Sequence, residues 1–135
     1  MKEKTFKATV ENTAAAVAFV EGALEEAGCP TKAQMQIGVA MDEVFVNIAS
    51  YAYPAGEGEA TVRFEMDEST RTVSITLTDR GTPFNPLKAK EPDITIPAEE
   101  RPIGGLGIFM VRKMMDEVLY EYKDGCNILT IRKKI

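Results

Sequence analysis

Residues 59–79, EATVRFEMDESTRTVSITLTD, indicate the fold class because apolar and polar side chains alternate along them in two runs. A period of two is typical of strands that bury one face. The polar residues 67–70 between the runs predict a turn, so the stretch predicts two antiparallel strands over 59–66 and 71–79. The apolar residues of the two runs are Ala60, Val62, Phe64 and Met66, followed by Val73, Ile75 and Leu77.

Upstream of this hairpin, the pattern predicts one strand and two helices. Residues 4–10 predict a short strand. Asn12 or Thr13 is the expected N-cap of a first helix, which ends at Gly28, and a second helix is predicted over 31–53. The apolar positions expected to be buried are Phe6, Ala8 and Val10 in the strand, Val17, Val20, Leu24 and Ala27 in the first helix, and Ile37, Met41, Val44 and Ile48 in the second.

Downstream, residues 80–103 contain five of the chain's seven prolines, which is typical of a functional loop or lid. A third helix is predicted over about 105–116, followed by strands over 117–123 and 126–134 that an Asp-Gly turn joins. The third helix is expected to bury Ile108, Val111 and Met115. The order strand-helix-helix-strand-strand-loop-helix-strand-strand predicts one α+β domain over 1–135, a two-layer sandwich of helices on a sheet.

Composition excludes several classes of function. The 135 residues hold 16 Lys and Arg against 21 Asp and Glu, and the net charge of −5 argues against a general nucleic-acid binder. The chain has no histidine, which excludes a Ser-His-Asp triad, a Cys-His dyad and His-ligated zinc within it. Two cysteines and no long apolar run favour a soluble, cytoplasmic protein.

Three short motifs carry candidate chemistry. Glu43 and Asn47 are four residues apart, which places both on one helical face, where a carboxylate can deprotonate a hydroxyl and an amide oxygen can bind Mg²⁺. Residues 79–84, Asp-Arg-Gly-Thr-Pro-Phe, end an apolar strand with a carboxylate that can accept an amino group, and Gly81 allows a flat ring to approach. Residues 104–107, Gly-Gly-Leu-Gly, open a helix whose N-terminus favours phosphate. Taken singly, each motif is equally typical of a solvated helix face, a turn or a helix cap.

In this order, the three motifs resemble the N, G1 and G2 boxes of the GHKL ATPase/kinase superfamily. The chain is most similar to the small bacterial anti-sigma factor serine/threonine kinases of that superfamily. The resemblance implies a Bergerat-type ATP-binding fold with a mostly antiparallel mixed sheet and an ATP lid over 85–103. It also implies transfer of the γ-phosphate of ATP to a serine or threonine of a small anti-anti-sigma (STAS-type) protein, binding of a sigma factor, and a homodimer as one oligomeric state.

The resemblance also implies a role for each site residue. Glu43 would activate the attacking hydroxyl, Asn47 would hold Mg²⁺, Asp79 would accept the adenine amino group, and Gly81 would let the base lie close. The remaining residues expected to contact ATP are Pro83, Phe84, Arg101, Gly104, Gly105, Leu106 and Gly107.

Two departures from the family pattern leave alternatives open. Tyr51 stands where many members have histidine, and Arg101 is three residues further from the glycines than usual, so that Lys88 or Lys90 could meet the γ-phosphate instead. The alternatives are a non-catalytic nucleotide-binding partner-switch module of the same fold and a detached ATP domain of a histidine kinase.

Overall fold

The computed structural model describes residues 1–54, 56–88 and 105–135, and it places five strands in one sheet. The order across the sheet is β1-β2-β3-β5-β4, with every neighbouring pair antiparallel. The described sheet is therefore antiparallel throughout, and not mixed as the resemblance implied. The strands are β1 (Lys2–Lys7), β2 (Glu59–Asp67), β3 (Thr72–Asp79), β4 (Glu117–Lys123) and β5 (Cys126–Lys134).

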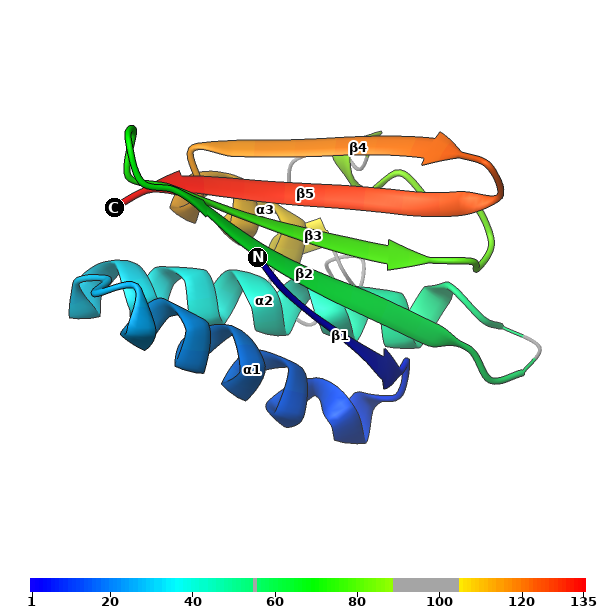
Figure 1. The fold of residues 1–135 in the computed structure, drawn as a ribbon. Helices are drawn as coiled ribbons and strands as arrows, with labels where there is room; N and C mark the ends of the chain where they lie inside the picture. The colour runs from blue at the N-terminus through cyan, green and yellow to red at the C-terminus, as the bar shows by residue number, and fades with distance from the viewer. Residues whose placement is uncertain (55, 89–104) are drawn as a thin grey trace.

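In the described part of the chain, three α-helices pack on one face of this sheet and form the second layer (Figure 1). They are α1 (Thr13–Glu26), α2 (Thr31–Tyr51) and α3 (Gly105–Met114), and short 3₁₀ turns occupy Val10–Asn12 and Pro86–Lys88. The predicted two-layer α+β sandwich is confirmed. Of the predicted lid, residues 89–103 lie outside the described residues.

The core lies between the two layers and follows the predicted periodicities. The side chains of Ile37, Met41 and Val44 on α2 are fully or almost fully buried, and they face alternate residues of β3 such as Ile75 and Leu77. Burial of side chains of this size contributes about 1.5–3 kcal/mol each. Ile108, Val111 and Met115 are buried as predicted.

The prediction for the N-terminal segment was wrong at one position. Val10 belongs to a 3₁₀ turn and is 59% exposed, because β1 ends at Lys7 instead of continuing to residue 10. The Asn12 side chain does not cap α1; its amide donates to the Lys7 carbonyl (2.9 Å) and fixes the turn that leads into the helix.

The β4–β5 hairpin was predicted to the residue. Asp124 (φ 54°) and Gly125 (φ 77°) both have left-handed backbones, as a two-residue turn with the twist of the strands requires. The turn places Tyr120 of β4 opposite Leu129 of β5. On its other side, the start of β5 pairs with the end of β3, so that Asn127 lies opposite Asp79.

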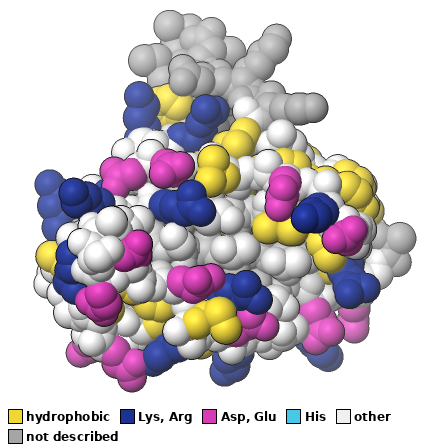
Figure 2. All heavy atoms as spheres, turned by 45° about the horizontal axis from the view of Figure 1, so that its top comes forward, with side chains coloured by type: hydrophobic (Ala, Val, Ile, Leu, Met, Phe, Trp, Pro, Cys, Tyr) yellow, Lys and Arg dark blue, Asp and Glu magenta, His cyan; other side chains and the backbone are white. Residues whose placement is uncertain are grey.

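The surface carries charges of both signs. On the face shown in Figure 2, Lys and Arg side chains are interspersed with Asp and Glu and do not gather into one basic area. Within the described part of the chain, no helix combines the length and the apolarity needed to cross a bilayer.

Candidate functional site

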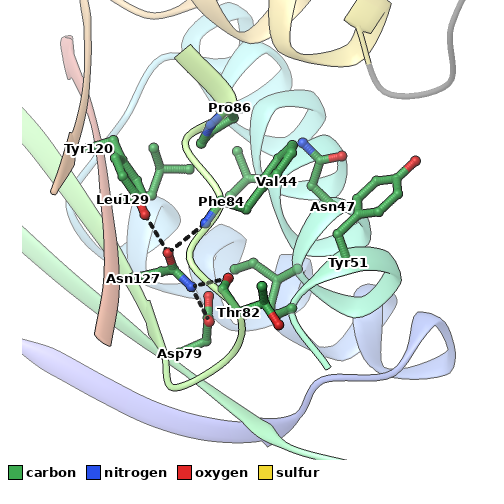
Figure 3. Close-up of a pocket in the computed structure, with 12 residues that line it drawn as sticks. Val44, Asn47, Tyr51, Asp79, Thr82, Phe84, Pro86, Tyr120, Asn127 and Leu129 are labelled. Atoms are coloured by element: carbon green, nitrogen blue, oxygen red, sulfur yellow. Dashed lines mark hydrogen bonds between the residues drawn. The ribbon is translucent and has the colours of Figure 1, made fainter. Parts of the chain in front are cut away.

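A small cavity lies between α2 and the adjacent ends of β3 and β5 (Figure 3). Its volume is about 30 Å³, enough for one or two water molecules. Apolar side chains form much of its wall, and Asp79, Asn127 and Asn47 add polar groups. The complete lining is Val44, Asn47, Ile48, Tyr51, Ala52, Asp79, Thr82, Phe84, Pro86, Tyr120, Asn127 and Leu129.

Asp79 is the buried acid of this cavity. It is the last residue of β3 and only 5% exposed. Its Oδ1 accepts hydrogen bonds from the backbone N–H of Gly81 (2.9 Å) and from the side-chain amide of Asn127 (2.9 Å). Among the described residues no hydrogen bond reaches the other carboxylate oxygen, so Asp79 retains an acceptor beside the cavity.

Asn127 is a site residue that the motif analysis did not identify. It faces Asp79 in the β3–β5 register and is 6% exposed. Its Nδ2 donates to Asp79 and to the Thr82 carbonyl (3.0 Å), while its Oδ1 accepts from the Phe84 N–H (3.1 Å) and the Tyr120 hydroxyl (2.5 Å). Figure 3 shows the amide at the centre of these four bonds.

Gly81 lies directly against the C-terminal end of α2. A Cβ added at Gly81 would be 2.2 Å from the backbone oxygen of Ala52, so any side chain would force the two segments apart. The next residue, Thr82, donates its N–H to the same oxygen (2.7 Å). The glycine therefore permits a close backbone approach, but the segment that it approaches in this structure is α2.

Aromatic rings stand at the mouth of the cavity. Phe84 and Tyr51 are stacked, with ring centroids 5.6 Å apart and planes at 26°, and both are partly exposed. Pro83, just before Phe84, is exposed. The cavity is smaller than a purine ring system, so side chains that line it would have to move before a base could enter.

Two further tyrosines lie near Asp79. Tyr120 belongs to the cavity lining, whereas Tyr53 lies outside it and contacts the backbone of Arg80. The Tyr53 hydroxyl donates to the Glu59 carbonyl (2.6 Å) and accepts from the Arg80 N–H (2.9 Å). Burial raises the pKa of Tyr53, and burial also raises the pKa of Tyr120. Both phenols therefore remain neutral hydrogen-bonding groups near neutral pH.

Glu43 and Asn47 both project from one side of α2, and both are half-buried. Glu43 contacts the first turn of α3: a Cβ added at Gly107 would lie 2.3 Å from Glu43 Oε2. The structure thus brings Glu43 to the glycine-rich helix start and Asn47 to the cavity that contains Asp79. A carboxylate at a helix N-terminus is electrostatically favourable.

The structure locates only part of the predicted phosphate-binding segment. Gly105 and Leu106 are the first residues of α3, whereas Arg101, Gly104 and Lys90 lie outside the described residues. No cluster of three or more acidic, cysteine or histidine side chains occurs in the described segments.

The fold and the site define a histidine kinase-like ATPase domain. The chain belongs to this family, which matches residues 6–133. A solved histidine kinase domain, from the blue-light activated histidine kinase of Erythrobacter litoralis, has the same fold, with a TM-score of 0.56 and 16% identity over 90% of this chain and 60% of that one.

Similar proteins of known name are serine or serine/threonine kinases. The serine-protein kinase RsbW of Bacillus mycoides is 33% identical over 95 residues, which is 67% of this chain and 58% of the relative. The serine/threonine-protein kinase BtrW of Bordetella bronchiseptica is 30% identical over 67% of this chain and 63% of its own length. RsbW of Listeria monocytogenes is 29% identical over 82% and 72%. The match thus spans about six tenths of the first two relatives.

Proposed function

We propose that this chain is an ATP-dependent serine/threonine kinase of the anti-sigma factor type. It binds ATP and Mg²⁺, transfers the γ-phosphoryl group to a hydroxyl of a small anti-anti-sigma (STAS-type) protein, and sequesters a sigma factor in another partner state. Membership in the family and the similarity to RsbW and BtrW support this proposal.

The observation that carries the proposal is the contact between Glu43 and Gly107. It brings a carboxylate to the N-terminus of α3, where helix geometry favours a phosphate chain, while Asn47, one turn further along α2, lines the cavity that contains the buried Asp79. A nucleotide whose base meets Asp79 and whose phosphates meet Gly105 and Gly107 would end near Glu43.

Each residue then has a defined task. Asp79 accepts the amino group of adenine through its second oxygen. The N–H groups at the start of α3 donate to the phosphates. Glu43 accepts the proton of the attacking hydroxyl, a contribution typically of about 10²–10⁴ in rate.

The donor set on α2 fits Mg²⁺. This ion keeps most of its waters and binds to substrate phosphates, so one or two protein oxygens are enough. Asn47 offers an amide oxygen on the cavity wall, and Glu43 lies one turn earlier on the helix. When bound, Mg²⁺ would neutralise charge that develops on the transferred phosphoryl group.

A non-catalytic nucleotide-binding module is the second candidate. The sequence feature that favours it is the position of Arg101: three residues separate it from Gly105, so no basic side chain stands directly before the glycines to meet the γ-phosphate. The two functions share the site and differ only in turnover.

Thermal unfolding with ATP·Mg²⁺ or GTP·Mg²⁺ tests the site. At 100 times Kd, binding adds about 2.7 kcal/mol of stability, or a rise of about 10 °C for a domain of this size. Asp79→Asn retains an oxygen for Gly81 and Asn127 but turns the second acceptor into a donor. We expect an ATP-selective rise that this variant loses. No rise at millimolar ATP would refute nucleotide binding.

Phosphotransfer separates the two candidates. Transfer of labelled phosphate to a purified STAS-type protein of the same genome should fall at least about 100-fold in Glu43→Gln, while the ATP-induced rise in unfolding temperature persists. The exposed neighbour Asp42, changed to Asn, is the matched control and should transfer normally. Binding without transfer in the unaltered protein would favour the non-catalytic module.

A further inference from the structure

We propose that Asn127 is a positioning residue that makes Asp79 the acceptor for the amino group of the base. This inference rests on the nucleotide site proposed above. It assigns a role to a residue outside the three motifs, through the hydrogen bonds that surround one buried amide.

The orientation of the Asn127 amide is fixed by its partners. A backbone N–H such as that of Phe84 can only donate, so the atom 3.1 Å from it is the amide oxygen. The Thr82 carbonyl can only accept, so the atom 3.0 Å from it is the amide nitrogen. With Asp79 and Tyr120 as the other partners, both N–H groups and both lone pairs of the amide are used.

This arrangement has a consequence for Asp79. Asn127 can present only an N–H to Asp79 Oδ1, which also accepts from Gly81. Both bonds orient the carboxyl through Oδ1, and its second oxygen is left to a ligand. The same amide holds Thr82 and Phe84, so the acceptor and the segment over the cavity are positioned together.

The chemistry predicts which bases this acceptor prefers. Adenine presents an amino group at position 6, which donates, whereas hypoxanthine presents a carbonyl there, which a carboxylate repels. ATP and ITP differ only at position 6 and at the adjacent N1, which accepts in adenine and carries a hydrogen in hypoxanthine. Their ratio of affinities therefore reports the accepting form of Asp79 and is insensitive to changes that weaken the whole pocket.

Asn127→Asp is the test substitution. It keeps the size of the side chain and an oxygen for Phe84 and Tyr120 but replaces the donating N–H by oxygen. Two buried carboxyl groups in hydrogen-bond contact retain one shared proton to higher pH than a single carboxyl does. At pH 6 that proton restores a donor toward Asp79, and by pH 8 its loss removes the donor.

The surrounding titratable groups are compatible with this window. They are Asp79 on β3, Tyr120 and Tyr122 on β4, Tyr53 after α2 and Cys126 on β5. Burial raises the pKa of both Tyr53 and Tyr120, so neither phenol titrates between pH 6 and 8.

We expect calorimetry to give an ATP preference over ITP of at least about tenfold in the unaltered protein at both pH values. In Asn127→Asp the preference should fall below about threefold at pH 8 and recover at pH 6. Gln34→Glu is the matched control: it also replaces an amide N–H that donates to a backbone oxygen (Cys29, 2.9 Å), far from the cavity, and it should behave like the unaltered protein.

Two outcomes would overturn the role of Asn127 alone. One is a ratio in Asn127→Asp within twofold of the unaltered protein at both pH values. The other is an equal fall at both, since a preference that the proton present at pH 6 does not restore cannot depend on a donor from residue 127 to Asp79. An unaltered protein that binds both nucleotides equally would refute adenine recognition by Asp79, and the inference with it.

If Asn127→Asp does not fold, Tyr120→Phe tests the same network. It removes one of the two donors to Asn127 Oδ1, so the amide is held less firmly, by the Phe84 N–H and the Thr82 carbonyl, and the ratio of affinities should fall about two- to tenfold without a pH dependence. An unchanged ratio in this variant would contradict the proposed role.

Discussion

Replacing Gly81 by alanine should destabilise the protein, although it adds a single methyl group. The added Cβ would lie 2.2 Å from the Ala52 oxygen, 2.5 Å from its Cβ and 2.6 Å from its carbonyl carbon. Ordinary contacts of a Cβ begin near 3.4 Å, so the loop and the end of α2 must separate by about 1.2 Å. These neighbours are mostly backbone atoms, so no side-chain rotation relieves the overlap.

The magnitude follows from two contributions. Overpacking of this kind costs about 1–3 kcal/mol. The separation also breaks or stretches the hydrogen bond from Thr82 N–H to the Ala52 oxygen, which costs about 0.5–1.5 kcal/mol. Together they lower the free energy of unfolding by about 1.5–4.5 kcal/mol, or the unfolding temperature by about 6–18 °C. Because Gly81 N–H also holds Asp79, ATP should no longer stabilise the variant.

Thermal unfolding followed by circular dichroism measures both effects, with and without ATP·Mg²⁺. Gly22→Ala on α1 is the matched control, because nothing lies within 4 Å of its added Cβ. Alanine in a helix is favoured over glycine by about 1 kcal/mol, so this control should be stabilised. A Gly81→Ala protein that unfolds at the temperature of the unaltered protein and responds normally to ATP would refute the close-approach argument.

Three further predictions concern single groups. In Gly107→Ala the added methyl displaces the flexible end of Glu43, so phosphotransfer should fall at least about tenfold, while stability should rise by up to about 1 kcal/mol because alanine is favoured in a helix; normal transfer with lower stability would contradict the contact. The Ser69 hydroxyl, and after it the backbone N–H groups of Ser69 and Thr70, donate hydrogen bonds to Asp67 and lower its pKa. The carboxylate therefore contributes stability above pH 4, and this contribution is lost as the pH falls through the lowered pKa. The difference in unfolding temperature between Asp67→Ala and the unaltered protein should therefore shrink from about pH 5 to about pH 3, and a constant difference would exclude this linkage. A thiol reagent should modify half-buried Cys126 first, because burial raises the pKa of the Cys29 thiol and shields it; equal rates would argue against that burial.

Periodicity predicted the fold well because each element buries one face. The alternation of β2 and β3 and the stripe of α2 each report which side of the element meets the other layer. The failure at Val10 has a local cause. Alternation alone cannot show where a strand ends, and here the chain turns into a 3₁₀ turn after Lys7, held by Asn12.

The motifs predicted part of the candidate site for a related reason. Glu43 and Asn47 lie four residues apart on one helix, so their shared face follows from the sequence alone. The contact of Glu43 with Gly107 does not follow from the sequence, because it depends on how α3 packs against α2 after a long connection. Gly81 illustrates the same limit: its need for a close approach was predicted, whereas its partner, the end of α2, emerged only from the packing.

Asn127 was missed although the sequence contains a signal for it. In β5 the residues that face the helices alternate as Asn127, Leu129 and Ile131, so an amide occupies a position where the strand pattern favours an apolar side chain. A buried polar group costs free energy unless it is hydrogen-bonded, which is itself an indication of a partner. Predicting that partner as Asp79 requires the β3–β5 register, which relates residues 48 positions apart. A polar residue on the buried face of a strand, read together with the pairing of that strand, is therefore the feature that connects β5 to Asp79, the acid proposed to bind the base.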